Sequence, residues 1–234
     1  MDYKVLVGLA TGEYARRADF YDYFNLLEKP AGSFALFAHD RSPAKSRNML
    51  IDAAKDVNCS HILIIDDDVA PEGDHLMRLL AHDVDIVSGL YFMRSYPHAP
   101  VAFDIANEKG ECMPMYMTPN LKGLHPVVAA GFGFLLIKMS VFDKLEKPYV
   151  RLAELDPEEW CDDIGFFKRV REAGIQSYVD LDVHVGHQGT MIVKPRRDKD
   201  GNWFTNYNTG SKYSFDVPQI NSSYKYDIGD AGNH

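Results

Sequence analysis

The feature that most constrains the fold is an apolar run that ends in three consecutive aspartates, the sequence HILIIDDDV over residues 61–69. Four large apolar residues in succession predict a strand that is covered on both faces, as in a parallel α/β sheet. Ligands of open α/β sheets bind beyond the carboxyl ends of the strands, so the aspartates are expected at the mouth of a site. Alternation along an extended segment would direct Asp66 and Asp68 to one side and Asp67 to the other.

Carboxylates held this close together raise one another's pKa unless a cation neutralises them. A hard divalent ion with oxygen ligands, Mg²⁺ or Mn²⁺, is the natural cation. The alternative is that one aspartate caps a helix predicted to begin at Pro71, where Pro71 and Glu72 are typical of a first turn. A cap accounts for one aspartate and leaves the other two, so binding of a metal or polar ligand is favoured. An EF-hand is excluded, because these acids follow a strand and Pro71 stands where that loop needs glycine.

Composition predicts a soluble globular protein, with 46% hydrophobic and 25% charged residues among 234. This length favours one large α/β domain, with two small domains as the alternative. The formal net charge of −9 argues against sequence-independent binding of nucleic acid, which needs clustered Lys and Arg. The three cysteines, Cys59, Cys112 and Cys161, are widely spaced and favour reduced thiols. No signal-peptide pattern and no apolar run of about 20 residues is seen, so a cytoplasmic location without a membrane span is expected.

The first ninety residues alternate between predicted strands and helices, which indicates a doubly wound sheet. Strands are predicted at residues 5–10, 34–38, 61–69 and 86–92, and helices at 15–27, from Ser42-Pro43 onward, and at 71–80. Beyond Phe92 several prolines divide the chain, and a β-hairpin is predicted from residues 101–105 and 112–117. Ser140 is expected to cap a short helix. From about Pro195 the chain is polar, and residues 195–234 are predicted to form an irregular tail or lid.

Two further features carry chemistry late in the chain. Asp162 and Asp163 begin a predicted helix that ends at Ala173 before Gly174, and His187 follows strands predicted at 177–179 and 183–185. Taken singly, an aspartate at a helix start is most often a cap, and a lone histidine is most often an ordinary polar residue. Their order after the three aspartates makes the combination more informative than each part.

The combination resembles the GT-A glycosyltransferases, in particular small family-2-like enzymes of bacteria and phages. The resemblance covers residues 5–187 and is carried by SRN at 46–48, the DxD motif in ILIIDDD at 62–68, AGFGFLLIK at 130–138, DDIGFF at 162–167 and HQG at 187–189. It implies a GT-A domain over residues 1–194, with a nucleotide-binding half at 1–92 and an acceptor half at 93–194. One departure is that Asp162-Asp163 stands where the family has Glu-Asp, which leaves open which of the two is the base.

The resemblance also implies roles in an inverting transfer from a nucleoside-diphosphate sugar, a UDP-sugar first, to a hydroxyl acceptor. The implied ligands of Mn²⁺ or Mg²⁺ are Asp66, Asp68 and His187. The residues implied to bind the sugar nucleotide are Thr11, Asp40, Arg47, Asp66 and Asp67. Asp163, or Asp162, would be the general base that deprotonates the acceptor. A glycan is the expected acceptor, and a nucleic-acid acceptor is less favoured by the acidic charge.

Alternatives remain. A haloacid-dehalogenase-like phosphatase also places Asp-x-Asp after an apolar strand, but it has Thr or Val where this chain has Ala70. A non-catalytic module for sugar nucleotides or glycans and a nucleotidyltransferase are further possibilities. Lys194, Arg196 and Arg197 are either a phosphate-binding lid or a solvated charge run. Aromatic residues that either stack on sugar or fill the core are Tyr91, Phe92, Tyr96, Phe132, Phe134 and Trp160, and core packing is favoured for most of them.

Overall fold

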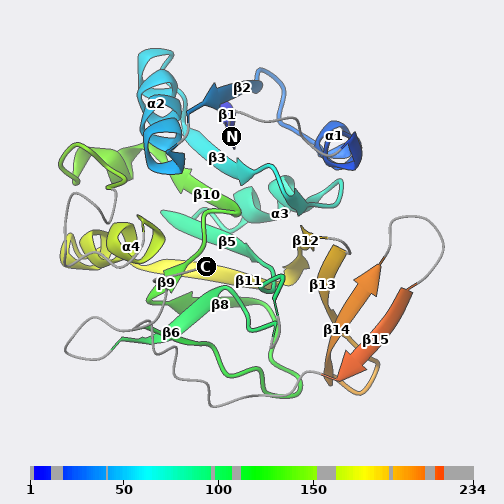
Figure 1. Ribbon diagram of the computed structural model, residues 1–234. Coiled ribbons are helices and arrows are strands. Elements are labelled where there is room, and N and C mark those ends of the chain that lie inside the picture. Colours follow the sequence, from blue (N-terminus) through cyan, green and yellow to red (C-terminus); the bar gives the residue numbers. More distant parts are fainter. Residues whose placement is uncertain are drawn as a thin grey trace, which may run out of the picture.

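A central sheet of seven strands organises the molecule (Figure 1). The computed structural model describes residues 3–11, 18–40, 42–95, 98–106, 112–151, 162–189, 192–208 and 214–218. The sheet has the order β2-β1-β3-β10-β5-β11-β8. Its strands are β1 (Val5–Thr11), β2 (Phe34–His39), β3 (His61–Asp66), β5 (Ile86–Leu90), β8 (Leu124–Val127), β10 (Phe134–Lys138) and β11 (Ser177–His184).

The sheet is mixed, and its parallel strands set the position of the acidic motif. Strand β3 is parallel to β1, with Ala10 beside Asp66, and antiparallel to β10, with Ile65 beside Phe134. Strand β11 is parallel to β5 and antiparallel to β8. The carboxyl ends of β1, β2 and β3 therefore meet at one edge, where Thr11, His39 and Asp66 lie.

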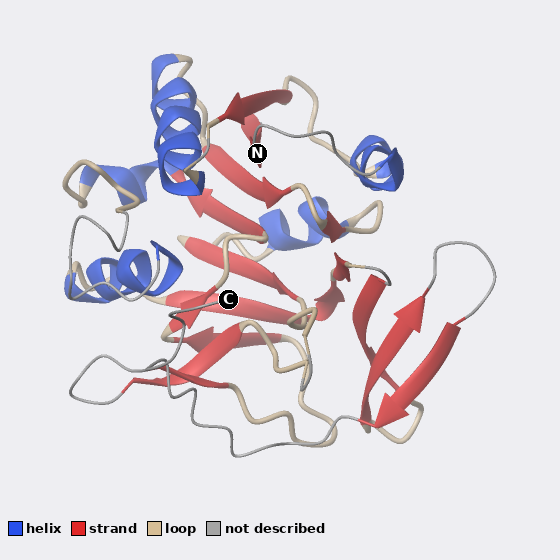
Figure 2. Ribbon diagram, viewed as in Figure 1, coloured by secondary structure: helices blue, strands red, loops and turns tan. Residues whose placement is uncertain are grey.

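Helices cover both faces of the sheet, as Figure 2 shows, because the side chains of each strand alternate between two cores. Ile62 and Ile64 of β3 face the core that includes α2 (Pro43–Asp56) and α4 (Asp162–Glu172). Leu63 and Ile65 face the other core, which includes α1 (Ala18–Leu26) and α3 (His75–Ala81). All four apolar residues of β3 are fully buried. The predicted fold class, a doubly wound α/β domain with a mixed sheet, is confirmed.

A second sheet, with the order β15-β14-β13-β12-β4, corrects the prediction of an irregular segment from residue 195 onward. Its strands are β4 (Val69–Ala70), β12 (Gly186–Gln188), β13 (Ile192–Arg197), β14 (Trp203–Asn208) and β15 (Ser214–Pro218). The ladder buries Trp203, Thr205 and Asn206, and Trp203 joins Val193 in a small apolar cluster, so a segment of mostly polar composition is held by backbone pairing and by a few apolar contacts. Residues 219–234 lie outside the described part of the chain.

A small third sheet holds the predicted hairpin. Strands β6 (Ala102–Ala106) and β7 (Cys112–Pro114) are antiparallel, and β9 (Ala129–Ala130) pairs with β6 on its other side. Residues 107–111, which connect the two predicted hairpin strands, lie outside the described residues. The strand and hairpin predictions in this part of the chain are confirmed.

Several boundaries differ from those predicted. Helix α3 begins at His75 rather than Pro71, so none of the three aspartates caps it. Ser140 lies inside a short 3-10 helix, η1 (Met139–Asp143), and does not cap it. The two predicted late strands form one continuous strand, β11. Helix α2 begins as predicted, with Ser42 Oγ accepting from the backbone N–H of Lys45.

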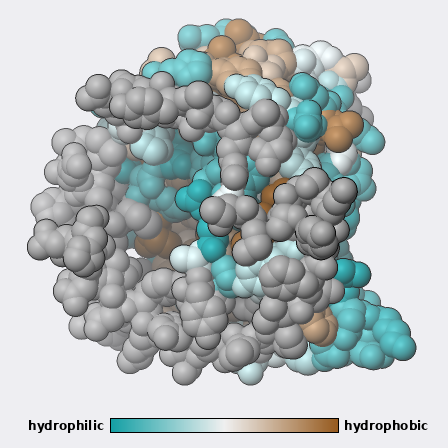
Figure 3. Space-filling view, turned by 45° about the vertical axis from the view of Figure 1, so that its right-hand side comes forward, coloured by the Kyte–Doolittle hydropathy of each residue, from teal (hydrophilic) through white to brown (hydrophobic). Residues whose placement is uncertain are grey.

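The described surface on one face of the molecule is mostly hydrophilic, with exposed apolar residues in small separate patches (Figure 3). Neither Cys59 nor Cys112 forms a disulfide bond, and Cys161 lies outside the described residues. Among the helices that the structure describes, none has the length and apolar character needed to cross a membrane.

Candidate functional site

The three aspartates diverge where β3 ends. Asp66 is the last residue of the strand, Asp67 and Asp68 form a turn, and Val69 enters β4 of the second sheet. The alternation expected of an extended segment therefore stops at Asp66. Asp66 and Asp68 belong to two different groups of side chains, while Asp67 lies half-buried in the turn between them.

Asp66 belongs to what we call the Arg47 cluster, which consists of Arg47, Asp66, Asp162 and Asp163. The Nη2 of Arg47 donates to Asp66, 2.9 Å from Oδ1 and 3.2 Å from Oδ2. The Nη1 of Arg47 donates to Oδ2 of Asp162 at the start of α4. The Arg47 side chain is only 6% exposed, and its guanidinium carbon lies 4.4 Å from the centre of the Phe132 ring. One buried cation thus connects the acidic motif to the acid pair.

Charge within the Arg47 cluster shifts two pKa values. Burial alone would lower the pKa of Arg47, but Asp66, Asp162 and Asp163 outweigh burial and raise it. Burial, together with the hydrogen bond that the protonated Asp163 donates to Asp162, raises the pKa of Asp163 to about 8, although Arg47 acts in the opposite direction. Asp163 is therefore the carboxyl of the pair that holds a proton at neutral pH.

Asp68 belongs to a second group, which we call the Asp68 cluster and which consists of Asp68, Arg94 and His187. The Nη1 of Arg94 lies 3.0 Å from Oδ2 of Asp68, and the Nε2 of His187 lies 3.6 Å from Oδ1. Burial alone would raise the pKa of Asp68, but His187 and Arg94 outweigh it and hold the value below its ordinary range. Asp68 therefore stays ionised at the edge of the site.

The backbone fixes the tautomer of His187. Its Nδ1 lies 2.8 Å from the carbonyl oxygen of Phe92, and a carbonyl only accepts, so Nδ1 carries the proton. In the neutral ring Nε2 then presents a lone pair toward the Asp68 carboxylate. A lone pair that faces a carboxylate is stabilised by a hydrogen-bond donor or a cation between them, such as water, a proton or a metal ion.

The segment from Gly131 to Phe134 separates the two clusters. A Cβ at Gly131 would lie 1.9 Å from the hydroxyl oxygen of Tyr91, and one at Gly133 would lie 2.8 Å from Cζ of the same ring. The backbone N–H of Gly133 donates to that hydroxyl oxygen, and the Tyr91 ring packs edge-on to His187 with 5.4 Å between centroids. Glycine is thus needed at both positions because the buried Tyr91 ring lies against the backbone.

The residues predicted to bind nucleotide lie at the same sheet edge, with different surroundings. Thr11 is buried, and its hydroxyl hydrogen-bonds the carbonyl of Ala38 and the ring of His39. Asp40 follows β2, and its Oδ1 accepts from the backbone N–H of Ser42. The guanidinium of Arg47 points into its carboxylate cluster, which favours a positioning role over direct contact with a nucleotide.

The structure does not show a preformed three-residue metal site. Among the described residues, no group of three or more His, Cys, Asp or Glu side chains is arranged to hold a metal ion. Asp68 and His187 face each other, whereas Asp66 is engaged by Arg47. An oxygen and a nitrogen donor from the protein nevertheless fit a divalent ion, because Mg²⁺ is usually bound by one or two carboxylates together with water and substrate phosphates.

The remaining predicted features lie nearby. Lys194 of β13 pairs with Glu72, and Arg197 pairs with Asp182, so both residues join the second sheet to the main body. Tyr91, Phe92, Phe132 and Phe134 are all buried in the core, while Tyr96 and Trp160 lie outside the described residues. Core packing, the favoured interpretation of these aromatics, is thus confirmed for the four described rings.

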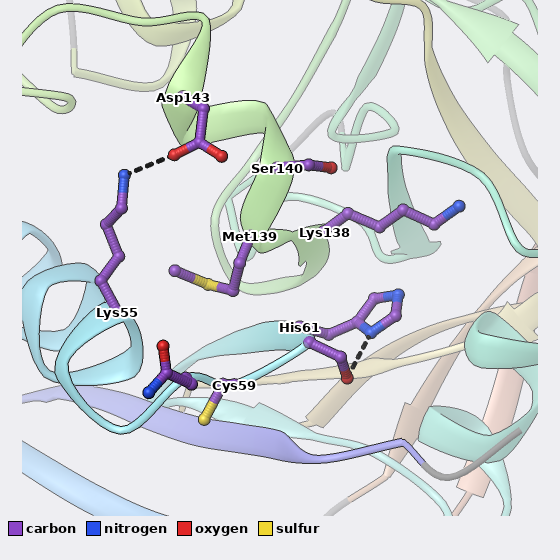
Figure 4. Close-up of a pocket in the computed structure, with 9 residues that line it drawn as sticks. Lys55, Cys59, His61, Lys138, Met139, Ser140 and Asp143 are labelled. Atoms are coloured by element: carbon purple, nitrogen blue, oxygen red, sulfur yellow. Dashed lines mark hydrogen bonds and ion pairs between the residues drawn. The ribbon is translucent and has the colours of Figure 1, made fainter.

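Two cavities lie apart from both clusters. One, of about 440 Å³, is at the opposite edge of the sheet, where Lys55, Cys59, His61, Lys138, Met139, Ser140 and Asp143 line it (Figure 4). The other, of about 550 Å³, runs along the outer face of α2 between Asp40 and Pro148, beside Asn48, Met49 and Asp52. The second borders Asp40, one of the residues predicted to bind nucleotide.

Two residues of the site, Arg94 and Tyr91, belong to no recognisable sequence motif. Arg94 stands alone between an apolar strand and a proline-rich stretch, and Tyr91 was assigned to the core or to sugar stacking. The glycines at 131 and 133 were the available signal for Tyr91, because two glycines flanking a buried Phe132 indicate a close approach of another group.

Comparisons with known proteins support the fold. No protein-family model matches the sequence, and no curated protein is similar to it. The structure is similar to that of A197 from STIV, with a TM-score of 0.56 and 15% identity over 96% of this chain and 99% of that chain. It also matches the catalytic domain of Drosophila beta1,4galactosyltransferase 7, solved in complex with xylobiose, with a TM-score of 0.46, 14% identity, and 77% and 66% coverage. The similarity to A197 concerns the fold alone and extends over nearly the whole of both chains.

Proposed function

We propose that this protein is a metal-dependent glycosyltransferase that moves a sugar from a nucleoside diphosphate to an acceptor hydroxyl with inversion. The main support for the proposal is that the aspartates after β3 belong to two separate groups, Asp66 with Arg47 and Asp68 with Arg94 and His187. Asp68 and His187 form an ion-binding pair, while Asp163 is a separate carboxyl of raised basicity beyond Arg47. Glycosyl transfer needs both parts, because charge develops on the leaving diphosphate while a proton leaves the acceptor.

On the donor side, Asp68 Oδ1 and His187 Nε2 would hold the divalent ion, Mn²⁺ or Mg²⁺, together with diphosphate oxygens. The chemistry that such an ion supplies is Lewis-acid stabilisation of the departing nucleoside diphosphate. Thr11, Asp40 and Asp67 remain the residues proposed to contact the nucleotide, with UDP as the first candidate. Arg47 instead holds Asp66 in place.

On the acceptor side, Asp163 is the proposed base and Asp162 positions it. Asp162 accepts from Arg47, so its carboxylate is already engaged, whereas Asp163 has the raised pKa that a general base needs. The base must be ionised to accept a proton. The value of kcat/KM is therefore expected to rise with pH and to level off above about 8.

The alternative functions differ in the carboxylate that each requires or in the product that each releases. A phosphatase of the haloacid-dehalogenase type would use Asp66 as a nucleophile, but both oxygens of Asp66 accept hydrogen bonds from Arg47, which lowers their nucleophilicity. A non-catalytic binding module would need Asp68 and not Asp163. A nucleotidyltransferase would release pyrophosphate rather than a nucleoside diphosphate.

A thermal-shift screen tests the donor site first. UDP, GDP, dTDP and CDP are added with and without Mn²⁺ to the wild type, to Asp68→Ala and to Asp74→Ala. Asp74 is a matched control because it is exposed and its side chain makes no capping bond to α3. Ligand at 100 times Kd adds about 2.7 kcal/mol of stability. The proposal expects a Mn²⁺-dependent shift with one diphosphate that Asp68→Ala abolishes and Asp74→Ala retains.

A second step separates catalysis from binding. Asp163→Asn is expected to keep that shift and to lose about 100-fold to 10,000-fold in transfer rate, the usual contribution of a general base. Full transfer by Asp163→Asn would contradict the assignment of the base. Release of pyrophosphate or inorganic phosphate as the first product would replace the proposal with one of its rivals.

A further inference from the structure

Arg94 has unused hydrogen-bonding capacity beside the proposed ion site. Its Nη1 contacts Oδ2 of Asp68 at 3.0 Å and donates to the carbonyl oxygen of Gln188 at 3.3 Å. A guanidinium has five N–H donors, and in the described part of the chain these two contacts both use Nη1. The side chain is 51% exposed, against 6% for Arg47. Arg94 is therefore free to change partners, whereas Arg47 is not.

The partner of Arg94 is the carboxylate proposed to take the divalent ion. With Mn²⁺ on Asp68, the guanidinium would face two positive charges at close range, and like charges at this distance repel. Arg94 and the ion thus compete for Asp68. The guanidinium must leave Oδ2, at least in part, whenever the ion arrives.

A diphosphate bound at the ion offers Arg94 a better partner. Its planar fork matches phosphate oxygens with two parallel hydrogen bonds, which a lysine ammonium cannot reproduce. The bond to the Gln188 carbonyl, next to His187 on β12, keeps the side chain close to the ion-binding pair. A small rotation of an exposed side chain is sufficient for the exchange.

We infer that Arg94 is a charge-exchange residue, which neutralises Asp68 when the donor site is empty and transfers to the diphosphate when ion and donor bind. This inference rests on the proposed function and adds a coupling to it. Arg94 opposes binding of the ion alone and favours binding of the ion together with a diphosphate. Each ligand then raises the affinity for the other by the same factor.

Separate measurements of Mn²⁺ affinity and of UDP affinity test the exchange, because the inference predicts that one substitution at Arg94 raises the first affinity and lowers the second. Free Mn²⁺ is followed by its electron paramagnetic resonance signal, and UDP binding in excess Mn²⁺ is followed by calorimetry. Relative to the wild type, Arg94→Met is expected to bind Mn²⁺ alone up to about fivefold more tightly, because a competing cation is gone. It is expected to bind UDP in excess Mn²⁺ about tenfold more weakly, because a charged hydrogen-bond donor to phosphate is lost.

Two further variants serve as controls. Arg94→Lys keeps the charge and loses the fork, so its affinity for Mn²⁺ alone should match the wild type while UDP binds more weakly. Arg78→Met removes the same charge from the last turn of α3 and should change neither affinity. A purely structural role for Arg94 would move both affinities in the same direction, and that result overturns the inference.

The outcomes also separate this inference from the function on which it rests. If the wild type binds Mn²⁺ and UDP together but Arg94→Met changes neither affinity, the exchange is wrong and the proposed donor site survives. If the wild type binds no pair of Mn²⁺ and nucleoside diphosphate, the donor site and the exchange are both overturned.

Discussion

Two arginines hold two aspartates of one motif, and they hold them in opposite ways. Arg47 is 6% exposed, lies over the face of Phe132 and contacts both Asp66 and Asp162. Arg94 is 51% exposed and contacts Asp68 through a single nitrogen. Both pairs are short salt bridges, so distance alone does not distinguish them. Burial and the number of partners do distinguish them, and they are the basis for proposing that Asp66 is structural and that Asp68 exchanges ligands.

The difference arises from where β3 ends. Asp66 still belongs to the strand, so its side chain meets Arg47 of α2, which also contacts Asp162 at the start of α4. Asp68 lies in the turn that follows β3, beside β12, where the chain segment after β5 supplies Arg94 and the carbonyl that orients His187. Asp66 and Asp68 are only two positions apart in the chain, yet the first is held by a buried arginine and the second by a half-exposed one.

The largest expected effect on stability comes from removing Arg47, the buried arginine. Arg47→Met leaves Asp66 and Asp162 without their shared cation, and removing one partner of a buried ion pair is strongly destabilising. Because these carboxylates are partly exposed, we expect a loss of about 2–4 kcal/mol in the free energy of unfolding, measured by urea denaturation. The free energy of unfolding of Arg47→Lys should lie between those of the wild type and Arg47→Met, because an ammonium keeps the charge but lacks the planar fork and stacks less well on an aromatic ring. Wild-type stability in Arg47→Met would mean that water already solvates these carboxylates.

The next effect concerns the segment between the two clusters. Gly131→Ala puts a methyl group 1.9 Å from the Tyr91 hydroxyl oxygen and 2.7 Å from Cγ1 of Val101, and overpacking of this kind costs about 1–3 kcal/mol. In a Tyr91→Phe background the nearest clashing atom is absent, so the same change should cost less. A double-mutant cycle of unfolding free energies measures the coupling. Equal costs in both backgrounds would show that Tyr91 moves away without penalty.

A third effect depends on pH and tests the charge of the acid pair. The folded state raises the pKa of Asp163 to about 8, above the ordinary value of an aspartate. The native state therefore binds more protons than the unfolded state between those values, and stability falls as pH rises through this window. Asp163→Asn removes the titration, so its Tm should exceed that of the wild type by a few degrees at pH 9, with a smaller difference at pH 5. A difference that does not depend on pH would contradict the raised pKa.

Much of the fold was accessible from the sequence because its signals are local. The run of four apolar residues predicts β3, Ser42-Pro43 predicts the start of α2, and both are confirmed. The second sheet was missed for a physical reason. In β14 the buried positions include Thr205 and Asn206, which are polar, and its pairing partner β13 offers only the short apolar pair Ile192 and Val193.

The sequence predicts which residue types form the site, but it does not predict which side chains contact one another. The acids and His187 were identified from their order, but the sequence does not reveal that Arg47 contacts an aspartate 115 residues away. A guanidinium near a predicted phosphate site favours nucleotide binding until the structure shows two carboxylates already in contact with it. Arg94 had no motif, because its significance depends on the turn that brings Asp68 toward it.

The smallest expected effect completes the comparison. Arg94→Met removes a half-exposed pair, and such pairs contribute about 0.2–1 kcal/mol and weaken as salt screens them. We therefore expect a loss below about 1 kcal/mol in the free energy of unfolding, measured as for Arg47→Met and reduced further in 1 M NaCl. The inference that Arg94 changes partners requires this small value, because a contact that is strong without ligand would oppose the exchange. If Arg94→Met destabilises the protein as much as Arg47→Met does, both arginines are structural, and the division between a fixed and an exchangeable aspartate is wrong.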